Sequence, residues 1–243
     1  RYQFFGRARM NILSIDTSSQ LLSIALLKND SLIEKSYSSD KKHSENIIPL
    51  LRNLMDKNGI NFSSLNGVTF GAGPGTFTGV RIAAGVAYGI AYAHNLPIVG
   101  INNLEAIAKK VDKAVVIPCV DARMGEVYMG AYKRINSEFI PIIDCGVFKL
   151  CNLPNLDLEE GIIVGSGVFE YKKNLSEKYQ AQKIIIDENE YPLAGAIAQL
   201  GIKKMDDNFN LKNAAPIYIR NKVAKTISER KVDIKDKETN NQL

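Results

Sequence analysis

Hydrophobic and polar residues alternate over the first forty positions in a way that predicts three short strands. The apolar runs cover residues 11–15, 21–27 and 32–37. A polar turn with the sequence Asp-Thr-Ser-Ser (16–19) separates the first two runs, and Asn29-Asp30, a pair typical of hairpins, separates the second two. The pattern predicts an antiparallel meander.

Two helices with different surfaces are predicted next. Residues 44–57 place Ile47, Leu50, Leu51 and Leu54 on one apolar face at helical spacing. The second helix, over residues 80–94, is rich in alanine and glycine. Each glycine in a helix interior costs about 1 kcal/mol relative to alanine. We therefore expect at least one face of this helix to pack closely on a neighbour.

A glycine-rich loop over residues 71–79 joins a predicted strand (67–70) to the second helix. Gly73, Gly75 and Gly79 indicate backbone conformations or close approaches that side chains resist. Free amides before a helix favour an anion. The loop therefore has two alternative interpretations, a phosphate site and a tight structural turn. The spacing is neither that of a P-loop nor G-x-G-x-x-G.

The strand pattern restarts after residue 111. Strands are predicted over residues 114–120, 126–132, 140–150, 161–164 and 216–220, and an amphipathic helix over 193–205. The arrangement of strand, acidic turn and strand thus occurs twice, at Asp16 and at Asp121. We expect two similar lobes, residues 10–110 and 111–221, with the helix 193–205 packing back on the first lobe.

Composition and charge narrow the possible functions. The 243 residues are 45% apolar, which fits a globular α/β protein. The net charge of +5 comes from the two ends, because residues 1–9 hold three arginines and no acid, and residues 222–243 hold six basic and four acidic residues. The neutral body has no charge excess that draws it to nucleic acid. We expect 1–9 to be an upstream extension or expression remnant and 222–243 to be disordered.

Cysteines and histidines give no sign of a metal site. The three cysteines lack C-x-x-C spacing and suit a reducing cytoplasm. His43 and His94 do not form the i, i+4 pair of a zinc hydrolase. No apolar run approaches the roughly 18 residues of a membrane span. The sequence predicts a cytoplasmic protein without membrane contact.

Four ordered blocks resemble the TsaB family, also called YeaZ. They are M-N-I-L-S-I-D-T-S (10–18), G-P-G-T-F-T-G-V-R (73–81), D-A-R-M-G-E-V-Y (121–128) and P-I-Y-I-R-N (216–221). The similarity extends over about residues 10–224. It implies the α/β fold of actin, sugar kinases and heat-shock chaperone ATPases, in which two lobes of mixed sheet with flanking helices grip ATP phosphates between two hairpin turns.

The resemblance also implies a function. The family takes part in making threonylcarbamoyladenosine beside the tRNA anticodon, as the non-catalytic partner that binds and activates the catalytic paralogue TsaD. TsaE joins the larger complex. ATP and metal are then expected on the partner subunits and not on this chain. The tRNA is reached indirectly through the complex, and the chain alone is expected to form a homodimer.

Departures from the ATPase pattern favour this accessory role. Asp16, Thr17 and Ser18 would be a vestigial phosphate turn, because serines stand where the fold usually has glycine, and Arg123 occupies the second turn. A stand-alone ATPase or kinase is the alternative, and a metalloprotease is weaker.

We expect the partner surface on the two helices, unless both only cover their own sheet. Its residues would be His43, Ile47, Leu50, Leu51, Leu54, Val80, Arg81, Ala84 and Tyr88. The loop glycines Gly73, Gly75 and Gly79 would position the second helix, with Arg81 bracing the loop or reaching an acidic group.

Overall fold

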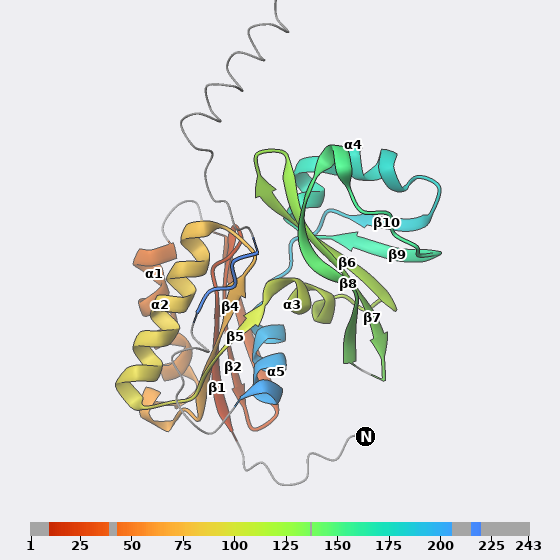
Figure 1. Ribbon diagram of the computed structural model, residues 1–243. Coiled ribbons are helices and arrows are strands. Elements are labelled where there is room, and N and C mark those ends of the chain that lie inside the picture. Colours follow the sequence, from red (N-terminus) through yellow and green to blue (C-terminus); the bar gives the residue numbers. More distant parts are fainter. Residues whose placement is uncertain (1–9, 39–42, 137, 206–214, 220–243) are drawn as a thin grey trace, which may run out of the picture.

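Two lobes of the same topology make up the computed structural model, which describes residues 10–38, 43–136, 138–205 and 215–219 (Figure 1). Each lobe holds a five-stranded sheet in which an antiparallel meander is followed by two parallel strands. The strand orders are β3-β2-β1-β4-β5 and β8-β7-β6-β9-β10, which match position by position. This confirms the predicted α/β fold of the actin and sugar-kinase type.

The first lobe begins with the predicted meander. Its strands are β1 (Asn11–Asp16), β2 (Leu21–Lys28), β3 (Ser31–Ser38), β4 (Gly67–Gly73) and β5 (Ile98–Asn102). Its helices are α1 (His43–Lys57), the short 3-10 helix η1 (Phe62–Ser64), α2 (Phe77–His94) and α3 (Asn103–Lys110). The central strand β1 is covered on both faces, so nearly all of its residues are buried.

The second lobe repeats the plan. Its strands are β6 (Val115–Arg123), β7 (Glu126–Ile135), β8 (Glu138–Lys149), β9 (Glu160–Val164) and β10 (Lys183–Asp187). They are joined by the 3-10 helix η2 (Leu150–Asn152), by α4 (Ser166–Tyr179) and by α5 (Ala194–Lys204).

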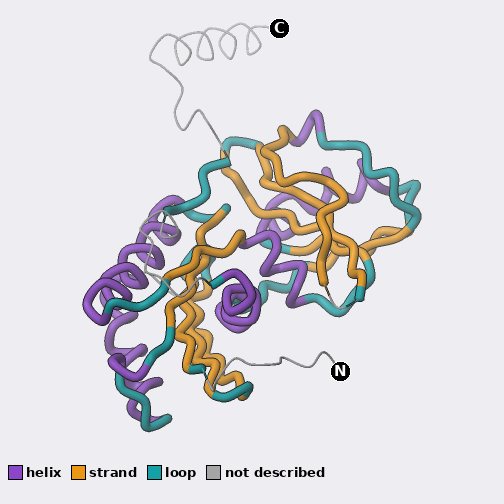
Figure 2. The backbone as a smooth tube through the Cα atoms, turned by 60° about the horizontal axis from the view of Figure 1, so that its bottom comes forward, coloured by secondary structure: helices purple, strands orange, loops and turns teal. Residues whose placement is uncertain are grey.

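The lobes exchange helices. Helices α1 and α2 cover one face of the first sheet, and α5, which follows the last strand of the second sheet, packs on the opposite face against β1, β2 and β4 (Figures 1 and 2). Helix α3, which ends the first lobe, packs in turn against β6, β7 and β8. A continuous apolar cluster that includes Leu104 and Ile197 therefore joins the lobes.

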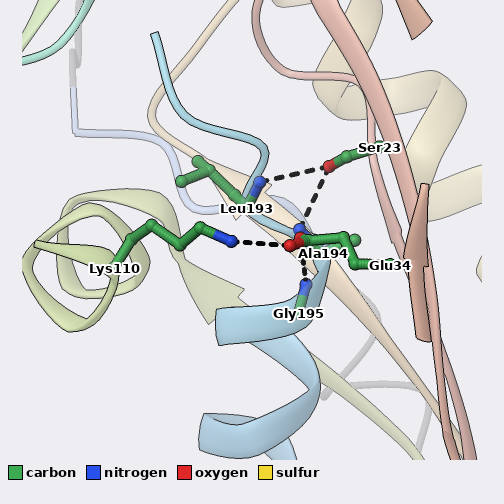
Figure 3. Close-up of polar contacts among 6 residues, drawn as sticks. All are labelled: Ser23, Glu34, Lys110, Leu193, Ala194 and Gly195. Atoms are coloured by element: carbon green, nitrogen blue, oxygen red, sulfur yellow. Dashed lines mark hydrogen bonds and ion pairs between the residues drawn. The ribbon is translucent and has the colours of Figure 1, made fainter. Parts of the chain in front are cut away.

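Side chains of the first sheet cap the N-terminus of α5 (Figure 3). Ser23 Oγ accepts the N–H groups of Leu193 and Ala194 at 3.2 and 3.0 Å, and Glu34 Oε1 accepts that of Gly195 at 2.7 Å. Lys110 Nζ of α3 donates to the other oxygen of Glu34 at 2.6 Å. These contacts satisfy N-terminal amides that a helix cannot satisfy itself, and they tie α5 to the first lobe.

Some predicted elements differ from the observed ones. Helix α2 begins at Phe77, earlier than predicted, and α3, α4 and β10 were not predicted. The strand predicted over 216–220 is wrong for its described part, because 216–219 form no strand and only the N–H of Ile217 reaches a carbonyl, that of Ala72, at 2.7 Å. The expectations for residues 1–9 and 222–243 lie outside the described residues. Across the described helices, none combines the length and apolar character needed to span a membrane.

Candidate functional site

The first hairpin turn faces inward. The Asp16 carboxylate is 1% exposed and accepts the N–H of Ser18 at 3.2 Å and the side-chain amide of Asn103 at 3.4 Å. The pKa of Asp16 is raised from 3.8 to about 6, and burial is the largest cause of this shift. A Cβ on Gly71 would lie 2.2 Å from the carboxylate. The group expected to face a phosphate is therefore packed inside the first lobe.

The glycine loop docks on this turn. A Cβ on Gly79 would lie 1.8 Å from the carbonyl oxygen of Thr17, and one on Gly75 would lie 2.6 Å from that of Ser18. The Thr17 hydroxyl donates to the Gly79 carbonyl at 2.6 Å, and the N–H of Thr76 donates to the Ser18 carbonyl at 2.7 Å. Loop and turn satisfy each other's polar groups, so the loop fixes where α2 begins.

Asn103 at the start of α3 links the two segments, and sequence reasoning missed it. Its amide nitrogen donates to the Ser18 hydroxyl and to Asp16, and its oxygen accepts the N–H of Gly73 at 3.3 Å. Gly73 has a φ of 102°, in the region that favours glycine. The sequence did contain a signal for this helix start, because the pair Asn102-Asn103 stands directly before an apolar helical pattern.

Arg81 braces the loop. Its guanidinium lies 3.2 Å above the centre of the Phe77 ring and 5.4 Å from that of Tyr218, and it donates to the Phe77 carbonyl at 3.3 Å. Within the described ranges it makes no ion pair with an acidic group. Of the two roles expected for Arg81, the bracing role is the one these contacts provide.

The second hairpin turn closes on itself. Asp121 accepts the backbone N–H of Arg123 at 2.7 Å and the Tyr171 hydroxyl at 3.1 Å, and it pairs with the Arg123 guanidinium at 3.2 Å. Arg123, Met124 and Gly125 all have positive φ values near 60–70°. The turn therefore presents a compensated carboxylate and long side chains where a phosphate-binding turn needs bare backbone.

A cleft of about 730 Å³ lies between the lobes, where the two turns and the glycine loop meet. Asp16 and Thr17 do not line it. Among the described residues, four carboxylates line it and Arg123 supplies the one cationic side chain; the acidic residues are Asp121, Glu170, Glu188 and Glu190. The first turn of α2 also reaches the cleft and favours an anion by about 0.3–1 kcal/mol. Asp121 and Glu188 pair with Arg123 and Lys172, whereas Glu170 and Glu190 form no ion pair with another described residue, so the described lining of the cleft is acidic.

The expected partner surface needs correction. Ile47, Leu51 and Leu54 of α1 are at most 4% exposed and form the core under the helix, so in this conformation they cannot contact a partner. Val80 and Ala84 of α2, also expected at the interface, are buried as well. Leu50 of α1 and Tyr88 of α2 are half-buried. Arg81 is exposed, and His43 begins α1, but its side chain is outside the described part. The apolar stripe holds α1 to its own sheet.

The outer side of α2 is open instead. A Cβ added to Gly85 or Gly89 would meet no atom within 4 Å, so these glycines serve no close contact within the described chain. One turn further along, Ala93 is exposed, and the Tyr92 ring, 68% exposed, stacks on Tyr88 with 5.8 Å between ring centres. Gly85, Gly89 and Ala93, which form this narrow surface, are small and lie four residues apart. The sequence therefore already contained the spacing that places them on one side of the helix.

A metal site is not evident among the described residues, where no three His, Cys, Asp or Glu side chains gather. His94 stacks on Phe62 with 6.3 Å between the ring centres. Burial raises the pKa of Cys119 far above its usual value, so its thiol stays protonated.

In comparisons with known proteins, the chain matches a TsaD family model and relatives named TsaB. The family model described as "TsaD: tRNA N6-adenosine threonylcarbamoyltransferase" matches residues 32–200. The TsaB proteins of Buchnera aphidicola from Schizaphis graminum and of Haemophilus influenzae, both named for tRNA threonylcarbamoyladenosine biosynthesis, are 32% and 27% identical. The alignments cover 72% and 88% of this chain and 87% and 95% of those proteins.

A third relative and a solved structure extend this agreement. The match to Escherichia coli TsaB, 36% identical, covers 51% of this chain and only 56% of that protein. The crystal structure of YeaZ from Pseudomonas aeruginosa superposes with a TM-score of 0.73 at 26% identity, over 86% of this chain and 99% of that one.

Proposed function

Because the chain belongs to the TsaB family, we propose that it is an accessory subunit in the biosynthesis of tRNA threonylcarbamoyladenosine. In this proposal it binds TsaD and makes it active, and it performs no chemistry itself. TsaE joins the pair, tRNA is contacted through the complex, and ATP and metal are held by the partner subunits. Without TsaD, a second copy occupies the same surface, because TsaD has a related fold.

The open outer face of α2 is the observation that supports this role best. Two glycines in a helix interior cost about 2 kcal/mol together relative to alanines, and nothing in the described chain uses the space above Gly85 and Gly89. Such a cost is offset when a second helix approaches the backbone closely. The exposed Tyr92 beside them supplies a large ring of the kind that anchors interfaces.

The interlobe cleft supports the non-catalytic half of the proposal. Asp16 is buried, Thr17 and Ser18 make internal hydrogen bonds, and carboxylates line the space. The alternative, a kinase or ATPase, is favoured by the position of the cleft between two hairpin turns. The charges and contacts of the cleft weigh against it.

The interface is tested by the double variant Gly85→Leu with Gly89→Leu. Both added side chains point into open space, so the monomer should fold with equal or higher stability. Affinity for TsaD, measured by titration calorimetry, should fall about tenfold or more because the helices can no longer approach. Lys173→Leu on α4, where the side chain is 88% exposed, is the matched control. Unchanged affinity in the double variant would place the interface elsewhere.

A further inference from the structure

The interlobe cleft has a chemistry that the proposed function does not use. Exposed aromatic rings stand at the cleft: Phe169 is 73% exposed, and Phe77 and Tyr218, each contacted by Arg81, are still 59% and 56% exposed. Two of the four carboxylates, those of Glu170 and Glu190, form no ion pair with another described residue. Rings beside uncompensated carboxylates suit a ligand that combines cationic groups with aliphatic stems, such as Lys and Arg side chains.

The chain itself delivers such a segment to the cleft. Ile217, Tyr218 and Ile219 line its wall, and the N–H of Ile217 anchors them to Ala72. The residues that follow directly, 220–231, read R-N-K-V-A-K-T-I-S-E-R-K and hold five basic residues and one acidic residue. The basic segment is therefore attached at the edge of the acidic cleft.

We propose that the interlobe cleft is a peptide-binding site whose occupant is this chain's own basic segment, residues 220–231. Lys222 and Lys225 pair with Glu170 and Glu190, and the aliphatic stems lie against the exposed rings. The cleft thus holds a peptide in the space where related folds hold a nucleotide. This inference is independent of TsaD binding, because the cleft residues are not those of the outer face of α2.

Reach and concentration both favour this occupant. An extended chain advances at most about 3.3–3.6 Å per residue, so Lys222 can reach about 10 Å beyond Ile219, a span suited to a cleft of about 730 Å³. A segment tethered this closely has an effective concentration in the millimolar range. Partly exposed ion pairs, weak between separate molecules, then suffice to keep it bound.

Zero-length carbodiimide cross-linking of the full chain, followed by peptide mass spectrometry, tests the proposal. Lys222 or Lys225 should be joined to Glu170 or Glu190. Mixing isotope-labelled and unlabelled chains should show links within one chain. The yield should fall about tenfold at 1 M salt, where the screening length is about 3 Å. The charge reversal Glu170→Lys with Glu190→Lys should also remove the link, whereas the control Glu159→Lys with Glu177→Lys, at exposed sites away from the cleft, should not.

A charge exchange makes the test specific, because carbodiimide joins a carboxylate and an amine in either direction. Adding Lys222→Glu and Lys225→Glu to the cleft reversal should restore the link. Links from these lysines to other surfaces, links only between different chains, or a yield that salt and reversal leave unchanged would each overturn the proposal. The wild-type map and its salt dependence decide the matter even if the reversed cleft fails to fold.

Discussion

At the scale of single residues, Asp16 shows how burial decides the role of a side chain. The sequence places it at the end of a strand, as a metal- or phosphate-facing carboxylate would be. Helices cover both faces of the first sheet, so the central strand β1 offers its residues no solvent-facing side. Asp16 becomes part of a buried polar cluster with Ser18 and Asn103. Strand alternation alone could not reveal this, because it depends on helices far away in the sequence.

The pH dependence of stability should carry the signature of Asp16. Its pKa is raised on folding from 3.8 to about 6, so the folded chain keeps a proton that the unfolded chain releases between these values. The stabilising contribution of the protonated carboxyl is complete below about pH 4 and is lost as the pH rises through 6. Between pH 4.5 and 7.5, we expect the free energy of unfolding to lose on the order of 2 kcal/mol from this group.

The Asp16→Asn variant separates this contribution from other titrating groups. Its amide cannot ionise, so the difference in unfolding free energy between variant and wild type should shift in the variant's favour as the pH rises. Urea unfolding at pH 4.5 and 7.5 measures that shift. A difference that is the same at both values would show that Asp16 does not titrate in this range.

At the scale of elements, the strongly patterned segments were predictable and the short ones were not. The meander, α1, β6, β7 and α5 follow from apolar spacing and turn residues. Strand β10 holds three consecutive isoleucines, too short a run to distinguish strand from helix, and it is fixed by parallel pairing with β9. Helix α3 spans two turns, although Asn102 caps it and lysines end it. Helix α2 starts before the predicted position because Gly79, which the sequence pattern assigns to the loop, lies in its first turn.

The cap of α5 should be measurable as an element-level contribution. Ser23→Ala removes the acceptor of two amides, and Glu34→Gln removes the charge from the other acceptor and from the pair with Lys110. Each change should lower the unfolding free energy by about 0.5–2 kcal/mol. Amide hydrogen exchange at residues 193–195 should become faster.

The exposed Ser31→Ala on the same sheet edge is the matched control for the cap variants. If both cap variants have the same unfolding free energy and the same amide exchange rates as this control, the apolar face of α5 alone holds the helix to the first sheet.

At the scale of the whole molecule, the fold is a duplicated unit whose halves have exchanged helices. The sequence revealed the duplication through two strands around an acidic turn, at Asp16 and again at Asp121. It could not show that the two turns would face a shared cleft with a net acidic described lining, since three of its four carboxylates come from α4 and from the segment after β10. It also could not show that the apolar stripe of α1 packs on its own sheet, because a stripe of equal spacing serves a core or an interface.

The accessory role is tested most directly by reconstituting the reaction. Purified TsaD and TsaE from the same organism, with threonylcarbamoyl-adenylate and unmodified tRNA, would be assayed with and without this chain, and the modified nucleoside quantified by mass spectrometry. We expect modification only when this chain and TsaD are both present, and loss of that stimulation with Gly85→Leu and Gly89→Leu. Equal modification by TsaD without this chain, or modification by this chain without TsaD, would contradict the account.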